Sequence, residues 1–213
     1  MDRELQPERG WATPAGTRLP VRPLAERGWV FRAAGHALRG LGRDEVPDLF
    51  VVLHLSPRLF WTWLAFASRL MPYGRLPPRL REKLILRTAW NCRCRYEWGQ
   101  HLDIAQRVGI AKGEIVALAR NEPAESALER AALGACDLVC AGEPIDEARW
   151  SVLRGELSEA LVLELLLLVG HYRMLAGVIV DAGLTLEAPF ERAIAELSAH
   201  AHVRVGVASE RDA

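Results

Sequence analysis

The chain has 213 residues, of which half are apolar and a quarter are charged. A chain of this length and composition forms one domain with its own core, and wholesale disorder is excluded. Lysine plus arginine and aspartate plus glutamate each total 27, so the formal net charge is zero. No general positive charge attracts nucleic acid or an anionic membrane, and we expect neither as a partner.

Membrane and export signals are weak. The longest apolar run covers residues 161–170 and contains Glu164, and it is about half as long as a membrane-spanning helix. The first thirty residues carry charges and prolines, without the apolar core or the small-residue cleavage site of a secretory signal. We expect a cytoplasmic protein with reduced thiols.

Residues 1–40 are expected to form an N-terminal arm. Proline and glycine recur too often before residue 25 for a regular helix or strand, and a short helix is predicted over residues 24–38. Trp11 and Trp29 indicate that this arm is pinned to the rest of the protein.

Residues 41–200 read as one helical domain. Serine or proline at the starts and glycine at the ends predict successive helices. They cover residues 46–54, 56–71, 79–90, 94–108, 112–120, 124–140, 144–154, 158–181 and 189–200. No stretch alternates apolar and polar residues for long enough to be a strand. The sequence therefore predicts an all-α fold, with a loose C-terminal tail over residues 201–213.

The predicted helix over residues 158–181 is apolar on nearly every face. Such a helix in a soluble protein is surrounded on all sides. We therefore expect it to be almost wholly buried, and we expect a second subunit to cover part of it in a homo-oligomer.

One window concentrates reactive side chains. Cys94, Glu97 and His101 are spaced i, i+3 and i+7, so on a helix they fall within about 60° of one another. A thiol, a carboxylate and an imidazole on one stripe can transfer protons near neutral pH. The alternative interpretation is a solvated Glu97–His101 pair beside a buried, inert Cys94.

The position of Cys94 near the start of its helix favours the thiolate. Glu82 lies twelve residues earlier, which corresponds to about 18 Å along an unbroken helix. Glu82 can therefore join this site only if the chain turns between Trp90 and Cys94.

The spacing of Glu82, Cys94, Glu97 and His101, with the sequences of residues 84–90 and 96–101, resembles the carboxymuconolactone decarboxylase and AhpD-like alkylhydroperoxidase superfamily, in particular its decarboxylase-like branch. The resemblance covers roughly residues 40–188. It implies an AhpD-like all-α helical bundle that assembles as a dimer, trimer or hexamer.

The resemblance also implies two kinds of chemistry. In hydroperoxidase members, a glutamate, a Cys-x-x-Cys pair and a histidine form a proton relay around a redox disulfide; the matching positions are Glu82, Cys94 and His101. Glu97 stands where the second, reactive cysteine would be. The decarboxylase-type members need no redox thiol and act on small oxo-acids or lactones, which suits Glu82, Glu97 and His101.

We therefore expect a cofactor-free acid–base enzyme acting on a small oxo-acid, lactone or related carbonyl compound. One alternative is an alkylhydroperoxidase with peroxiredoxin-type antioxidant activity through Cys94 and His101. The other is a non-catalytic helical oligomer.

Other residues are weaker candidates. Arg87 could anchor a substrate carboxylate, or be an ordinary solvated arginine, and His171 with Tyr172 could face the pocket or belong to the core. Cys136 and Cys140 could join Cys92 and Cys94 in a zinc site, but the spacings are unusual and core cysteines are favoured. Glu97 and His101 lack an evident third metal ligand. We expect no metal and no other cofactor.

Overall fold

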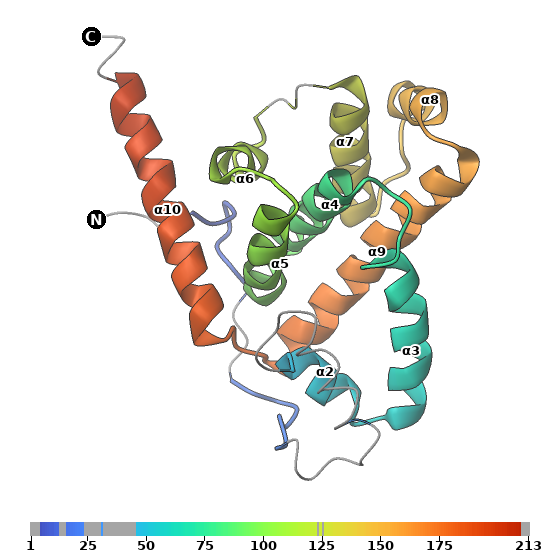
Figure 1. Ribbon diagram of the computed structural model, residues 1–213, viewed down its shortest axis with the longest axis vertical. Coiled ribbons are helices and arrows are strands. Elements are labelled where there is room, and N and C mark those ends of the chain that lie inside the picture. Colours follow the sequence, from blue (N-terminus) through green and yellow to red (C-terminus); the bar gives the residue numbers. More distant parts are fainter. Residues whose placement is uncertain are drawn as a thin grey trace.

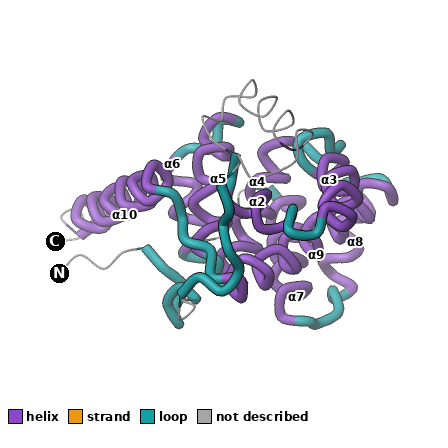
Figure 2. The backbone as a smooth tube through the Cα atoms, turned by 90° about the horizontal axis from the view of Figure 1, so that it is seen from below, coloured by secondary structure: helices purple, strands orange, loops and turns teal. Residues whose placement is uncertain are grey.

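The computed structural model describes residues 5–12, 16–23, 31, 46–122, 124 and 126–209, and within these ranges it is helical without any strand (Figures 1 and 2). The helices are α2 (Asp48–Leu53), α3 (Pro57–Leu70), α4 (Pro78–Asn91), α5 (Arg95–Arg107), α6 (Lys112–Ala119), α7 (Ala127–Ala141), α8 (Glu147–Glu156), α9 (Glu159–Ala182) and α10 (Ala188–Ser209). The predicted all-α fold is confirmed.

Helix α4 is the centre of the bundle. It packs against α5, α6, α7 and α9, while α3 lies along α9 and α10 packs on α5 and α6 at the opposite side (Figure 1). Ten consecutive α4 residues, 80–89, are buried. A polar side chain on this helix therefore lies in a dry interior, where it needs a partner or must give up its charge.

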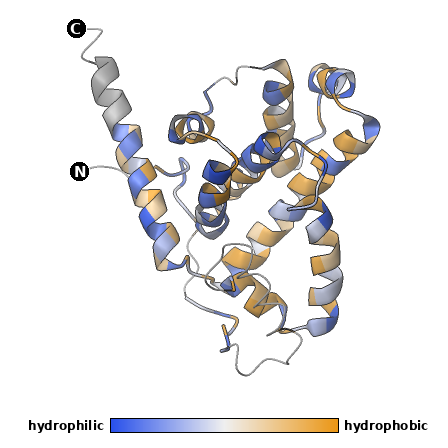
Figure 3. Cartoon of the chain, in the orientation of Figure 1, coloured by the Kyte–Doolittle hydropathy of each residue, from blue (hydrophilic) through white to orange (hydrophobic). Residues whose placement is uncertain are grey.

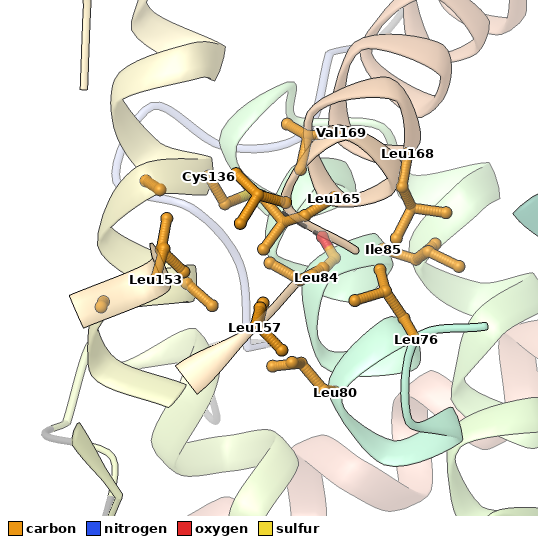
Figure 4. Close-up of a cluster of buried hydrophobic side chains, with 14 of the residues drawn as sticks. Leu76, Leu80, Leu84, Ile85, Cys136, Leu153, Leu157, Leu165, Leu168 and Val169 are labelled. Atoms are coloured by element: carbon orange, nitrogen blue, oxygen red, sulfur yellow. Dashed lines mark hydrogen bonds between the residues drawn. The ribbon is translucent and has the colours of Figure 1, made fainter. Parts of the chain in front are cut away.

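The main hydrophobic core joins α4 to α7, α8 and α9. Figure 4 shows Leu84 and Ile85 of α4 against Leu165 and Leu168 of α9, with Leu153 of α8 alongside. Each of these side chains is fully buried, which stabilises the fold by about 1.5–3 kcal/mol per side chain. This packing fixes α4 against α9 and thereby positions the polar residues that both helices carry.

A tight turn separates α4 from α5. Helix α4 ends at Asn91, Arg93 adopts a left-handed conformation with φ of 58°, and the Cys94 amide donates to the Ala89 carbonyl at 2.8 Å. The chain therefore reverses between Trp90 and Cys94, which is the condition for Glu82 to approach α5.

The N-terminal arm holds this turn in place. The Arg93 side chain donates to the Gly10 carbonyl at 2.7 Å, and the Ala12 amide donates to the Arg93 carbonyl at 2.9 Å. Trp11 packs against Trp90 and Trp98, with ring centroids 5.4 and 6.0 Å away. The prediction that Trp11 pins the arm is thus confirmed.

Several predicted boundaries need correction. Helix α7 starts after Ser126, whose side chain accepts from the Glu129 amide, and α8 starts after Asp146, whose side chain accepts from the Arg149 amide. Helix α10 continues to Ser209, beyond residue 200 where the sequence analysis ends it. The predicted helix over residues 24–38 and Trp29 lie outside the described residues, except for position 31.

A single copy of the chain does not bury the helix over residues 158–181 almost wholly, and its burial with a second subunit stays a prediction. Residues Leu163, Leu167 and Met174 of α9 are exposed, and Gly170 and Gly177 extend the same exposed stripe. These five positions alternate spacings of four and three residues, the pattern of a helix–helix packing seam. Figure 3 shows how apolar α9 is along its length.

Helix α9 is long and apolar enough to cross a membrane by length and composition alone. Its apolar segment extends beyond the run of residues 161–170 that is evident in the sequence. Half of its most apolar window is buried inside the chain, against α3, α4, α7 and α8. A core helix of a soluble protein has the same properties, so this feature is weak support for membrane insertion.

Candidate functional site

Glu82 and His101 meet in the interior of the bundle. Glu82 Oε2 of α4 lies 2.8 Å from His101 Nδ1 of α5, and Glu82 is completely buried while His101 is 8 % exposed. When Nδ1 carries a proton, it donates this hydrogen bond to the Glu82 carboxyl group, and Nε2 is left to exchange protons with another group.

Arg81 holds the other oxygen of the same carboxylate. Its Nε donates to Glu82 Oε1 at 3.3 Å, and its Nη1 donates to the Pro72 carbonyl at 3.2 Å. Glu82 is therefore a buried carboxylate shared between a guanidinium and an imidazole, which compensates the cost of its burial. The sequence analysis missed Arg81, because adjacent residues on a helix do not normally face each other.

Glu97 is a buried carboxyl group of a different kind. It lies one turn before His101 on α5 and is 3 % exposed. Within the described residues, neither of its carboxyl oxygens has a hydrogen-bond partner. Burial raises the pKa of Glu97 well above its usual range, and the nearby Cys140 raises that pKa further. Burial therefore favours the neutral carboxylic acid form of Glu97, which has a proton to give.

Cys94 is fully buried at the position just before α5. Burial raises the pKa of its thiol well above the usual range, and Glu97 adds to the shift, while the backbone N–H groups of Tyr96 and Glu97 oppose it. The sequence analysis expected the helix start to favour the thiolate. That influence is present, but burial outweighs it, and Cys94 is a neutral thiol.

Tyr172 of α9 packs against the pair formed by Glu82 and His101, referred to below as the dyad. Its ring meets the His101 ring edge-on, with centroids 5.1 Å apart. His171 contacts Tyr172 but stacks on Trp63 of α3 at 6.0 Å, and burial lowers the pKa of His171 to about 4. Tyr172 thus lies against the site, whereas His171 faces the aromatic cluster of α3.

The structure does not bring Arg87 to this group. Its guanidinium donates to both oxygens of Asp137, at 2.6 and 2.9 Å, and to Leu118 and Asn121, at 2.8 Å each. Arg87 is 7 % exposed and links α4 to α6 and α7. Its role in the fold is structural, and it is not placed as the substrate anchor that the sequence analysis considered.

Within the residues the structure describes, no cluster of three or more histidine, cysteine or acidic side chains is arranged to hold a metal ion. An open hollow between α7, α8 and α9 is lined by Val139, Trp150 and Leu166 among others. None of the candidate site residues of this subsection lines this hollow. The imidazole of His101 and the carboxyl groups of Glu82 and Glu97 are groups that can transfer protons.

Comparison with known proteins agrees with this description. Residues 57–137 match the Carboxymuconolactone decarboxylase family, and no curated protein matches the sequence.

Three solved structures share the fold. A cysteine-to-alanine variant of the debrominase Bmp8, in complex with 2,3,4-tribromopyrrole, is 14 % identical, with a TM-score of 0.73 over 86 % of this chain and 98 % of that one. The alkylhydroperoxidase AhpD core of a peroxidase-related protein from Ralstonia eutropha JMP134 is 21 % identical, with a TM-score of 0.73 over 82 % and 94 %. A peroxidase-related protein from Silicibacter sp. TM1040 is 16 % identical, with a TM-score of 0.71 over 84 % and 95 %.

The match to the Carboxymuconolactone decarboxylase family covers 81 of the 213 residues, and the fold is shared with AhpD-like structures. The family match includes Glu82, Cys94, Glu97 and His101.

The neutral state of Glu97 has a consequence for stability. An unfolded glutamate has a pKa near 4.5, and the folded pKa is higher. The folded protein therefore binds more protons above pH 4.5, and its free energy of unfolding falls as the pH rises from there through the folded pKa, by at most about 1.4 kcal/mol per pH unit. We predict that Glu97→Gln removes this decline.

Urea unfolding at several pH values from 5 to 8 measures the effect. The exposed residue Glu143 provides the matched control, since Glu143→Gln leaves the Glu97 contribution in place. Parallel pH profiles for the wild-type protein and Glu97→Gln would contradict a neutral Glu97.

Proposed function

We propose that this protein is a cofactor-free acid–base enzyme that acts on a small oxo-acid, lactone or related carbonyl compound. The observation that carries the proposal is the 2.8 Å contact between buried Glu82 and His101, with the neutral acid Glu97 one turn away on the same helix face. In one reaction, Glu82 can orient His101 as the base while Glu97 acts as the acid.

The roles follow from the protonation states. In a decarboxylation, the bond from the substrate to its carboxylate breaks and carbon dioxide leaves. The electron pair moves onto the neighbouring carbonyl as an enolate. Glu97 or protonated His101 then gives its proton to the carbanion carbon, and Glu82 stabilises the imidazolium that forms during proton exchange. In a lactone isomerisation, His101 would first take a proton from the carbon beside the carbonyl.

A thiol enzyme working through Cys94 and His101 is the second candidate. It is supported by the shared fold with peroxidase-related proteins and with the debrominase, of which a cysteine variant was crystallised. The neutral, fully buried Cys94 and the glutamate at position 97 favour the acid–base reaction instead, because a thiolate is the nucleophilic form of cysteine.

Two single substitutions separate the candidates. The assay uses a panel of β-oxo acids and γ-lactones with a free carboxylate, together with tert-butyl hydroperoxide. His101→Ala should lower turnover of the carbonyl substrate by about 10²–10⁴-fold, the usual contribution of a positioned acid or base. Cys94→Ser should retain most of that turnover. Gln106→Ala, at an exposed position of the same helix, is the control.

Other results would redirect the assignment. Peroxide consumption that disappears in Cys94→Ser, without any turnover of the carbonyl panel, would favour the thiol enzyme. Full turnover by both His101→Ala and Cys94→Ser would exclude this site and favour a non-catalytic scaffold.

We also propose that a second copy of the chain covers the exposed stripe of α9. Its apolar and small residues are spaced for helix packing, and isolated apolar seams of this length are unusual on a monomer surface. The substitution pair Leu163→Glu and Leu167→Glu should convert an oligomer to monomers in sedimentation experiments, without loss of helix content. Leu59→Glu, at an exposed site of α3, is the control. A monomeric wild-type protein would contradict this proposal.

A further inference from the structure

The candidate site is closed in a single copy of the chain. In the dyad, Glu82 is completely buried and His101 nearly so, and Cys94 and Glu97 are buried beside them. Neither carboxyl oxygen of Glu97 has a hydrogen-bond partner among the described residues. A buried polar atom without a partner calls for an explanation, and a ligand that supplies the missing donor is one. Such a ligand can reach Glu97 only if a covering element moves.

Helix α2 covers the start of α5. Leu49 and Val52 of α2 pack in one buried cluster with Cys94 and Tyr96, next to the end of α9 that leads into α10 (Figure 1). Cys94 directly precedes α5, and Tyr96 adjoins Glu97 in its first turn. Moving α2 therefore uncovers this turn, whereas α4, α5 and α9 form the interior of the bundle.

The short length of α2 makes its position depend on contacts with the rest of the chain. It has six residues, Asp48–Leu53, and a helix this short is not stable by itself in water. Another face of α2 packs Val51 against Phe60 of α3, and α3 buries only Phe60 and Leu70 of its fourteen residues. Helix α2 can therefore move away from Cys94 together with α3, without separating α4, α5, α7 and α9.

One carboxyl group connects α2 to α5. Glu187, directly before α10, accepts a hydrogen bond from the Asp48 amide of α2 at 3.4 Å. It also accepts from the Tyr96 hydroxyl at 3.0 Å and from the Gln100 side chain at 2.7 Å, both on α5. The Tyr96 hydroxyl accepts in turn from the Leu49 amide at 3.2 Å. Glu187 and Tyr96 thus bind two amides at the start of α2 that have no carbonyl partner within that helix.

We propose that α2 is a lid over the candidate site and that Glu187 is the positioning residue that holds this lid closed. The lid admits a small-molecule ligand to Glu97 from the side of Cys94, and this inference rests on the proposed function for the location of the site. Opening breaks the two contacts made by the α2 amides. The α5 side chains stay bonded to Glu187, so the acceptor remains in place for the lid to close again.

Alkylation of Cys94 by N-ethylmaleimide measures this opening without any substrate. The native protein is treated briefly with the reagent and digested with chymotrypsin, which cleaves after Trp90 and Tyr96. Cys92 and Cys94 then lie in one short peptide, and fragmentation of that peptide distinguishes them. Cys136 is also completely buried but belongs to the main core, so its alkylation reports opening of the whole fold.

We expect Cys94 to react faster than Cys136 in the wild-type protein. In Glu187→Ala, the rate at Cys94 should rise about 10–100-fold because hydrogen bonds that favour the closed lid are lost, while the rate at Cys136 should stay within about two-fold. Tyr96→Phe removes only the hydroxyl and should act in the same direction. Glu187→Gln keeps one acceptor oxygen and should have a smaller effect than Glu187→Ala.

Glu191→Ala is the matched control. Glu191 also joins α10 to α5, but its carboxyl group pairs with Arg95 rather than with α2. This variant should leave the rate at Cys94 unchanged, and circular dichroism confirms that each variant is folded.

Three results would each overturn the proposal. They are equal rates at Cys94 and Cys136 in the wild-type protein, a Cys94 rate in Glu187→Ala that matches the wild type, and an equal rise in Glu191→Ala. The alkylation rates require no turnover, so failure of the proposed acid–base reaction would leave them unaffected.

Discussion

The contact between Glu82 and His101 is the interaction on which the rest of the site depends. The two residues lie nineteen positions apart, on helices that are antiparallel neighbours only because the chain reverses at residues 91–94. That reversal needs a left-handed residue, Arg93, which the N-terminal arm holds through Gly10 and Ala12. The N-terminal arm therefore stabilises the turn that brings Glu82 and His101 together, although it supplies no reactive group.

Burial determines which chemistry each group can perform. Arg81 and His101 contact the buried carboxyl group of Glu82, whereas Glu97 has no such partner among the described residues and burial raises its pKa. The same dry surroundings keep Cys94 neutral. The two carboxyl groups thus acquire different roles from their immediate surroundings.

The sequence predicts the helices and the proximity of Cys94, Glu97 and His101, because both depend on local periodicity and on local start and stop signals. The approach of Glu82 depends on a turn for which Asn91 is the only local signal, and the family resemblance supplied it. The sequence could not predict that Arg87 is engaged by Asp137, since this contact depends on how α7 packs against α4. The composition of α9 does not reveal which of its faces lacks a neighbour within one chain.

The most direct test of the account is nuclear magnetic resonance of the protein with isotope-labelled histidine, which reports the protonated nitrogen of each ring. The His101 signal is assigned by its disappearance in His101→Ala. The account predicts a proton on Nδ1 that is shared with Glu82 and protected from solvent exchange, and that loses this protection in Glu82→Gln. A His101 ring protonated only on Nε2, or a Nδ1 proton unaffected by Glu82→Gln, would contradict it.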